Sequence, residues 1–310
     1  MYSEAKKIIS FPDNQVFIGI GPNAWRNDDD PDIGKDCTFE QAISEIALAG
    51  YSGCEVNCLF PAADTRLVKD KLDLRGLRIA SAWYGSYLAT LPYEENEKSF
   101  INMLEYLKAL KSDCVNVCEQ SYSLQKNTSV PIYSQKPVLT DEEWLRFVGG
   151  LKKFGVLAKD YGILMTYHHH IGTVVCTPEE IDRLLNGVAP ELLSLCFDDS
   201  HFSFYGIDPA AMARKYAART GHIHLKSVRK DRLKRVKEEN MHFINSLHIG
   251  AFTIPGDGDT EYAPILQAFA NVGYKGWLLI EADQDPAIAT KEPLYYAKEG
   301  RNYLRELTGL

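Results

Sequence analysis

Apolar and polar residues follow one another along the chain in a repeating order of strand and helix. Apolar runs with the character of strands covered on both faces occur eight times, at residues 16–21, 53–56, 77–83, 114–119, 163–167, 192–197, 221–226 and 277–281. Helical spacing or a helix-start signal follows each run, near residues 38–50, 64–74, 94–111, 140–161, 177 onward, 208–219, 261–272 and 294–307. Eight consecutive strand-then-helix units predict an α/β fold, a single (β/α)8 TIM barrel.

Three of these helices begin with clear N-terminal signals. Thr38 with Gln41, and Thr140 with Glu143, have the spacing of a capping box, in which the two side chains satisfy free backbone groups reciprocally. Residues 177–180 read Thr-Pro-Glu-Glu, which supplies an N-cap, a proline at the first helical position and an acid at the third. These signals predict where the three helices start.

The domain organisation follows from length and from the absence of breaks. The 310 residues show no repeat and no linker-like composition, so we expect one domain over 1–310. Residues 1–15 would form an N-terminal extension, and 228–260 a long irregular insertion on the pocket side. A doubly wound open sheet is the alternative, but it would normally carry a Gly-rich phosphate turn after the first strand, and residues 19–24 lack its third glycine.

Composition and charge exclude several classes of protein. The chain has 34 Lys and Arg against 42 Asp and Glu, a net charge of -8, which disfavours binding to nucleic acid. No apolar run approaches the roughly 20 residues of a membrane helix, and the start of the chain lacks the apolar region of a secretory signal. Seven scattered cysteines indicate reduced thiols in a cytoplasmic protein. The sequence leaves open whether the chain forms a homo-oligomer.

Candidate chemistry begins at the triple histidine that ends the fifth predicted strand. Because side chains alternate along a strand, His168 and His170 would share one face and His169 the other. A solvated strand end with one satisfied ring is the plain alternative to a metal site. Other strand ends favour the metal, because they also carry carboxylates or imidazoles and would face one pocket. They include Glu55, Glu119, Asp198, His224 and Glu281.

Two acids and two histidines from this set suit a divalent cation such as Mn²⁺, Co²⁺ or Zn²⁺. The set we predict as metal ligands is His168, Asp198, His224 and Glu281. Asp199 competes with Asp198, since alternation allows one of them to point inward, and His170 competes with His168. His222 shares a face with His224 but lies farther from the strand end, so we expect it lower in the barrel.

Several segments together carry a resemblance to a known family. They are Trp25-Arg26-Asn27-Asp28-Asp29, Tyr167-His168-His169-His170 with Gly172-Thr173, Pro255-Gly256-Asp257-Gly258, Ile280-Glu281-Ala282 and Arg301-Asn302-Tyr303. On these the chain resembles the inosose dehydratases of inositol catabolism, within the xylose-isomerase-like barrel superfamily. That resemblance implies a metal on the four ligands named above and, by family association alone, glutathione as a further cofactor.

Three departures from the family pattern lie near the expected pocket mouth. After strand six the pattern reads Asp-Thr-Gly-His where residues 198–201 read Asp-Asp-Ser-His. Asn57-Cys58 stands in place of two glycines, and Ser227 in place of an aspartate after Lys226. These differences leave the fold prediction intact and leave the substrate open among related keto-cyclitols.

The implied reaction is elimination of water from 2-keto-myo-inositol through an enediolate. A base removes the proton α to the carbonyl, an acid protonates the departing hydroxyl, and the metal polarises the carbonyl. We predict Glu119 as the base, His201 as the acid and Lys226 as a group that polarises the carbonyl or donates a proton. The alternative for Glu119 is a carboxylate that holds substrate hydroxyls, and the alternative for Lys226 is an ion pair with a ligand carboxylate. The predicted substrate-binding residues are Trp25, Arg26, Glu55, Trp83, His170 and Asp257.

Rival functions differ in what happens after proton removal. A metal-dependent sugar or inosose isomerase or epimerase on the same barrel would return the proton and lose no water. An apurinic-site endonuclease shares the barrel but needs a basic groove, which the net charge of -8 disfavours. A non-catalytic sugar-binding module would not need ligand-type residues at several strand ends.

Overall fold

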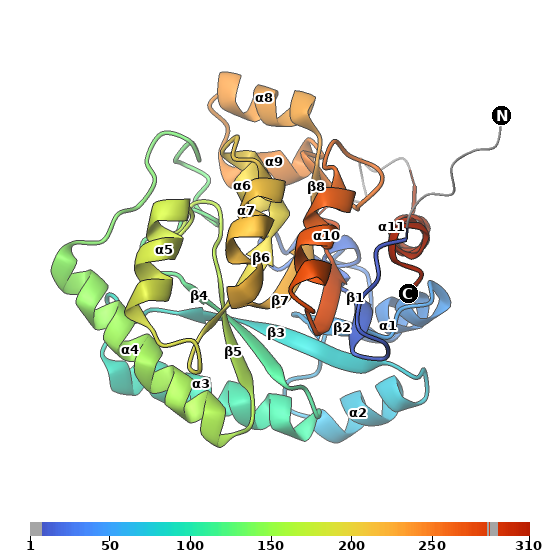
Figure 1. Ribbon diagram of the computed structural model, residues 1–310, viewed down its shortest axis with the longest axis horizontal. Coiled ribbons are helices and arrows are strands. Elements are labelled where there is room, and N and C mark those ends of the chain that lie inside the picture. The colour runs from blue at the N-terminus through green and yellow to red at the C-terminus, as the bar shows by residue number, and fades with distance from the viewer. Residues whose placement is uncertain (1–7, 284, 286–290) are drawn as a thin grey trace.

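Eight parallel strands close into a barrel in the computed structural model, which describes residues 8–283, 285 and 291–310 (Figure 1). Around the barrel the strands follow the order β1-β10-β7-β6-β5-β4-β3-β2. They are β1 Val16–Ile20, β2 Gly53–Val56, β3 Arg78–Ser86, β4 Cys114–Glu119, β5 Leu164–His168, β6 Ser194–Asp198, β7 Thr220–Leu225 and β10 Gly276–Ile280. This confirms the predicted TIM barrel, and all eight strands lie within a few residues of their predicted positions.

Helices form the outer layer, and all but the last of them return the chain to the start of the next barrel strand. They are α1 Phe39–Leu48, α2 Thr65–Asp73, α3 Tyr93–Ala109, α4 Asp141–Asp160, α5 Pro178–Gly187, α7 Pro209–Tyr216, α10 Tyr262–Asn271 and α11 Pro293–Thr308. A short helix that the sequence reading missed, α6 Asp199–Phe204, begins directly at the end of β6. The apolar side of this layer packs on the outer faces of the strands in one continuous core.

The helix-start predictions are confirmed in two cases and half confirmed in the third. Thr140 and Thr177 both form complete capping boxes with the glutamates three residues on. Thr38 accepts a hydrogen bond from the backbone N–H of Gln41, as expected. The Gln41 side chain, however, donates to Glu45 instead of returning to the backbone of Thr38.

The insertion after β7 is ordered, so the prediction of an irregular segment over 228–260 is wrong. It contains α8 Lys230–Glu238, α9 Phe243–His248 and a two-stranded antiparallel sheet of β8 Ser227–Val228 and β9 Phe252–Thr253. We call residues 227–260 the cap, because they follow the C-terminal end of β7 and stand at one end of the molecule in Figure 1. The helical period of α8 is obscured by its charge, since nine residues carry two buried apolar side chains, Leu233 and Val236.

The cap has a small apolar core of its own. Leu233, Val236, Phe243, Leu247 and Phe252 pack in one cluster with side chains from the loops after β1, β4 and β5. The long loop after β4 therefore does more than connect two elements, because its side chains pack against the cap. Together these segments build a wall around the C-terminal end of the barrel, where the site residues gather.

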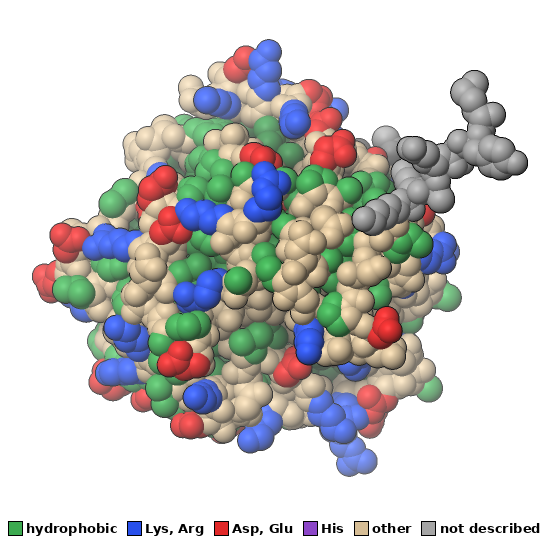
Figure 2. Space-filling view, viewed as in Figure 1, with side chains coloured by type: hydrophobic (Ala, Val, Ile, Leu, Met, Phe, Trp, Pro, Cys, Tyr) green, Lys and Arg blue, Asp and Glu red, His purple; other side chains and the backbone are tan. Residues whose placement is uncertain are grey.

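Two remaining features concern the ends and the surface. Of the predicted N-terminal extension, Ile9 and Phe11 are buried, and the Ile9 N–H donates to the carbonyl of Leu307 in α11. On the face shown in Figure 2, acidic and basic side chains are interspersed. Within the described part of the chain, no helix combines the length and apolar character required to cross a bilayer.

Candidate active site

Three buried side chains from β6, β7 and β10 meet at the C-terminal end of the barrel. Asp198 ends β6, His224 lies one residue before the end of β7, and Glu281 follows β10 directly. His224 Nδ1 lies 3.5 Å from Glu281 Oε1 and 4.0 Å from Asp198 Oδ2. One ligand atom from each residue lies within 4.8 Å of the others. This arrangement is suited to a divalent cation with nitrogen and oxygen ligands.

Atoms in this cluster lack the hydrogen bonds that buried polar atoms normally make. Among the described residues, Asp198 Oδ2, His224 Nδ1 and His168 Nε2 have no hydrogen-bond partner. Leaving a carboxylate oxygen buried and unpartnered costs free energy, and a cation between these atoms would satisfy them together. The donor set therefore fits a divalent metal ion.

His168 reaches the same cluster from β5, but the position of the proton on its ring limits its use as a ligand. His168 Nε2 lies 3.5 Å from Asp198 Oδ2, and Trp83 Nε1 donates to His168 Nδ1 at 3.2 Å. A neutral ring that accepts at Nδ1 carries its proton on Nε2. His168 can bind a cation through Nε2 only if the Trp83 contact is given up, so Asp198, His224 and Glu281 form the better-matched set.

Lys226 places a positive charge beside these carboxylates. Its Nζ lies 2.7 Å from Glu281 Oε2 and 2.6 Å from Asp283 Oδ2. Burial favours the neutral amine, but Asp283 and Glu281 outweigh burial and raise the pKa of Lys226 well above its usual value. In Asp198 and Glu281 burial opposes ionisation, yet Lys226 outweighs it and holds both pKa values well below the usual range. Asp198 and Glu281 are thus ionised carboxylates beside the ammonium of Lys226.

A cavity of about 490 Å³ opens beside the cluster. Six predicted site residues line it, namely Glu55, Trp83, His168, His170, Lys226 and Glu281. Other side chains that line it were not predicted, including Asn23, Asp28, Asp29, Gln120, Gln125, Lys126 and Asp283. Because most of these groups donate or accept hydrogen bonds, the cavity suits a small hydroxylated molecule.

Glu55 supports the cluster from below while it lines the cavity. Its Oε1 accepts hydrogen bonds from Ser81 Oγ at 2.8 Å and Asn116 Nδ2 at 2.7 Å. The same oxygen lies 3.6 Å from His224 Nε2. A carboxylate behind a histidine fixes the ring orientation and keeps its other nitrogen directed at the ligand site.

His170, two residues beyond His168, also faces the cavity. Its Nδ1 lies 2.9 Å from the carbonyl oxygen of Ile171, and its Nε2 lies 3.2 Å from Gln125 Nε2. The proton is therefore on Nδ1, and Nε2 accepts from the amide of Gln125. Burial and the neighbouring ring of His168 lower the pKa of His170 well below its usual value, so the ring is neutral.

Glu119, the predicted general base, does not reach the cavity. It ends β4 and is fully buried, but its carboxylate is directed at backbone and hydroxyl donors. Oε2 accepts from Ser86 Oγ at 2.7 Å and the Leu88 N–H at 3.0 Å, and Oε1 accepts from the N–H groups of Ala89 and Ser121. These contacts hold the loop after β3, which is a structural task.

Three of the predicted substrate-binding residues lie outside the cavity lining. Trp25 is buried in the core, and its Nε1 donates to Glu45 at 2.6 Å. Arg26 donates to the carbonyl of Lys35. Asp257 pairs with Arg229 at 2.6 Å in the cap.

His201, predicted as the general acid, lies behind Asp198 on α6. Its Nε2 is 3.4 Å from Asp198 Oδ2, and it is fully buried. Burial and the neighbouring ring of His170 lower the pKa of His201 well below its usual value. The ring adds to the histidines around Asp198 instead of facing the cavity.

Asp283 is the missed residue that the sequence could have revealed. It follows Glu281 by two positions, so an extended chain places both on one side. Its Oδ1 accepts from Asn23 Nδ2 at 2.8 Å, and its Oδ2 from Lys226 at 2.6 Å. Of the two aspartates after strand six, Asp198 lies in the cluster, whereas Asp199 accepts hydrogen bonds from the Lys226 N–H and from Tyr262.

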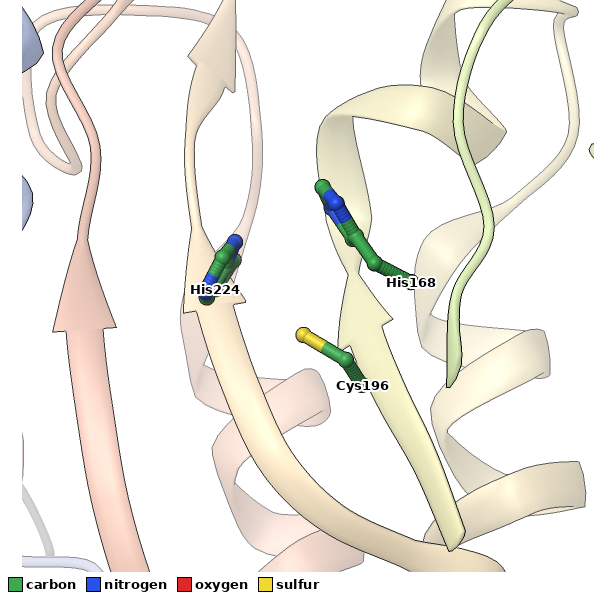
Figure 3. A group of neighbouring side chains, drawn as sticks. All are labelled: His168, Cys196 and His224. Atoms are coloured by element: carbon green, nitrogen blue, oxygen red, sulfur yellow. The ribbon is translucent and has the colours of Figure 1, made fainter. Parts of the chain in front are cut away.

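Cys196 offers a second, softer ligand set lower in the barrel. Its thiol points from β6 toward the space between His168 and His224 (Figure 3), and ligand atoms of the three lie within 4.8 Å. Burial raises the pKa of Cys196 to about 11, so the thiol stays protonated at neutral pH. Since a metal binds the thiolate, the ionised carboxylates above it form the favoured site.

Comparisons with known proteins identify the family of the chain and agree with the observed barrel. Residues 43–307 match the family model described as xylose isomerase-like TIM barrel. The chain is 46% identical to an inosose dehydratase of Clostridium tetani over 296 residues, which cover 96% of this chain and 98% of that protein. It is 43% identical to an inosose dehydratase of Geobacillus thermodenitrificans over 300 residues, 97% of this chain and 100% of that protein.

Solved structures with lower identity share the fold. A D-psicose 3-epimerase determined in the presence of D-fructose has a TM-score of 0.69 at 18% identity, covering 95% of this chain and 100% of its own. The IOLI protein with a bound zinc atom has a TM-score of 0.68 at 14% identity, with the same coverage. At these identities the likeness concerns the barrel and not the reaction.

Proposed function

Since the chain belongs to the xylose isomerase-like TIM barrel family and, within it, to the inosose dehydratases, we propose that it eliminates water from 2-keto-myo-inositol. The observation that carries this proposal is the cluster of Asp198, His224 and Glu281 beside a polar cavity. A ring ketone with hydroxyls on its other carbons would find hydrogen-bond partners along much of the cavity wall. A cavity of about 490 Å³ lies within the usual range for small-molecule sites.

Asp198, His224 and Glu281 would hold the divalent cation, with His168 as a fourth ligand if its ring turns away from Trp83. When bound there, the cation supplies Lewis-acid stabilisation of the carbonyl oxygen, typically worth several kcal/mol. Mn²⁺ or Co²⁺ is the form we propose, with Zn²⁺ as the alternative. Glutathione remains a prediction from family association.

Lys226 is the residue of this chain best suited to bind the carbonyl end of the substrate. Its ammonium is buried, lines the cavity and stays protonated next to Glu281 and Asp283. A fixed positive charge in a water-poor site stabilises negative charge that develops on a neighbouring oxygen. Because the pKa of Lys226 is raised, its role is electrostatic, and proton donation to the leaving hydroxyl falls to another group.

Cavity residues on the other walls would fix the ring. Glu55 and Gln120 offer hydrogen bonds to hydroxyls, and Trp83 offers an apolar edge to the ring carbons.

We place the reaction in inositol catabolism and in the cytoplasm, in line with seven free cysteines.

Metal removal and restoration test the function directly. The protein is stripped with a chelator, dialysed, and assayed on 2-keto-myo-inositol with single metals added back. A conjugated diketone absorbance that depends on Mn²⁺ or Co²⁺ supports the dehydratase. Interconversion of inosose isomers without that absorbance would favour the isomerase, and full activity in the stripped protein would contradict the metal requirement.

A further inference from the structure

Three consecutive aspartates, Asp28, Asp29 and Asp30, follow the first strand, and two of them have structural tasks. Asp28 Oδ1 accepts the N–H of Cys58 at 3.0 Å, which joins the loops after β1 and β2. Asp30 accepts the N–H of Asp32 at 3.0 Å and lies 2.9 Å from His248 Nε2 in the cap. Substitution of either would disturb the loop or its link to the cap.

Asp29 differs from both neighbours in what its carboxyl contacts. Its backbone N–H donates to Asn27 Oδ1 at 2.8 Å, which holds the turn. Within the described residues its carboxyl makes no hydrogen bond or ion pair, and it lines the cavity together with Lys226 and Glu281. It is partly buried, so it can meet a bound molecule without being fully hydrated.

Charged groups on several elements surround Asp29. Among these charges, Asp283 in the segment after β10 raises the pKa of Asp29 most, and Asp28 raises it less. Lys126 in the loop after β4 and Lys226 after β7 lower it. Opposing charges of this kind suit a proton-transfer group, because such a group must pass readily between its charged and its neutral form.

From this placement we propose that Asp29 is the general acid that protonates the departing β-hydroxyl. The assignment rests on the dehydratase function proposed above. A carboxylate base of the cavity wall takes the α-proton, and the electron pair of the C–H bond forms the enediolate. The carbonyl then re-forms, the electron pair of the enediolate becomes the new C=C bond as the C–O bond to the β-hydroxyl breaks, and the proton of Asp29 leaves with that oxygen as water. The base releases its proton to solvent. The resulting enol then tautomerises to the diketone, and Asp29 recovers a proton from solvent.

The charge environment agrees with that role. Burial and the carboxylate of Asp283 raise the pKa of Asp29 to about 7, against the opposing pull of Lys126 and Lys226. A carboxyl with this pKa is substantially protonated at neutral pH, whereas a free aspartate is not. Two predicted proton-transfer groups, Glu119 and His201, lie outside the cavity lining, so Asp29 takes the place of His201 in the scheme.

The test compares Asp29→Asn with Asp32→Asn in the metal-loaded protein. Asp32 lies in the same loop and is exposed, so it controls for the loss of one loop carboxylate. Both variants are checked by circular dichroism and thermal unfolding. Elimination is followed by diketone absorbance across pH, and exchange of the substrate α-proton is followed by NMR in D₂O.

We expect Asp29→Asn to lower kcat by roughly 10²-fold or more, the usual size of general-acid catalysis, with little change in KM. The wild type should lose kcat as pH rises through about 7, and Asp29→Asn should lack that limb. Exchange of the α-proton should continue in the variant, because its removal precedes protonation of the hydroxyl. Asp29→Glu should recover part of kcat, and Asp32→Asn should match the wild type.

Each other result overturns a distinct statement. If Asp29→Asn keeps wild-type kcat and the same pH limb, Asp29 is not the acid. If it loses α-proton exchange together with elimination, Asp29 acts before the hydroxyl leaves, and the assignment as acid is wrong. If the wild type exchanges no α-proton and forms no diketone, the dehydratase proposal itself fails and the role of Asp29 falls with it.

Discussion

Two buried glutamates at strand ends, Glu119 as the last residue of β4 and Glu281 directly after β10, have similar sequence contexts and opposite environments. Glu119 accepts hydrogen bonds from four donors, three of them backbone N–H groups, and stays away from the cavity. Glu281 faces Lys226 and His224 and lines the cavity. A buried carboxylate needs partners, and the nature of the partner decides between structure and chemistry.

The two strand ends also differ in the contacts that hold the neighbouring loops. At the β4 end, Glu119 fixes the loop after β3 by bonds to the main chain. At the β10 end the carboxylates meet side chains that carry charge, so a cation or a substrate can compete for them. Predictions about the two glutamates should therefore separate activity from stability.

Glu281→Gln should have the largest effect. Loss of the carboxylate removes one of the three best-matched ligand residues and part of the charge that holds Lys226 protonated. We expect kcat to fall by roughly 10³-fold or more, equivalent to several kcal/mol of Lewis-acid stabilisation. Activity and bound metal are measured together after dialysis. A variant with normal metal content and normal kcat would remove Glu281 from the site.

Substitution of the two histidines sharpens the metal assignment. His224→Asn should weaken metal binding by roughly 100-fold, and His168→Asn by about tenfold, because Trp83 already occupies the Nδ1 lone pair of His168. Calorimetric titration with Mn²⁺ gives both affinities. Equal losses would show that His168 gives up the Trp83 contact and binds as a full ligand.

Glu119→Gln should lower stability and leave activity nearly unchanged, the opposite of the pattern expected for Glu281→Gln. The amide nitrogen of glutamine would face N–H or O–H donors on one side, which leaves buried groups unsatisfied at a cost of about 1–3 kcal/mol. We expect a lower midpoint in urea unfolding and a kcat close to that of the wild type. A large loss of kcat at unchanged stability would restore Glu119 as the catalytic base.

These contrasts explain what the sequence could predict. Apolar runs and capping signals predicted the eight strands and three helix starts, because both depend on local spacing. Strand ends with acids and imidazoles predicted the cluster of Asp198, His224 and Glu281, since a barrel brings those ends together. The direction of Glu119 was not predictable, because it depends on donors contributed by another loop. The sequence did not distinguish Asp29 from Asp28 and Asp30, because what separates the three aspartates is the set of residues around each of them in the folded chain.

The smallest expected effect concerns the contribution of His248 to stability, through its contacts with Asp285 and Asp30. His248 in the cap lies 2.8 Å from Asp285 in that loop and 2.9 Å from Asp30 after β1. Burial favours the neutral ring, but the two carboxylates outweigh burial and raise the pKa of His248. A raised pKa means that this stabilisation is fully present below the unfolded value of about 6.5 and is lost as pH rises through the folded value.

Thermal unfolding of the wild type and His248→Gln between about pH 5.5 and about pH 8.5 tests this link. We expect the wild type to be more stable at the acidic end and the difference to shrink toward the alkaline end. Because the His248 side chain is 42% exposed, solvent screening keeps the contribution below about 1 kcal/mol. Asp30→Asn, which removes one of the two carboxylates, should give a smaller pH-dependent difference. A gap between wild type and His248→Gln that is constant with pH would mean that His248 supports the cap by packing alone, as Glu119 supports its loop without titrating partners.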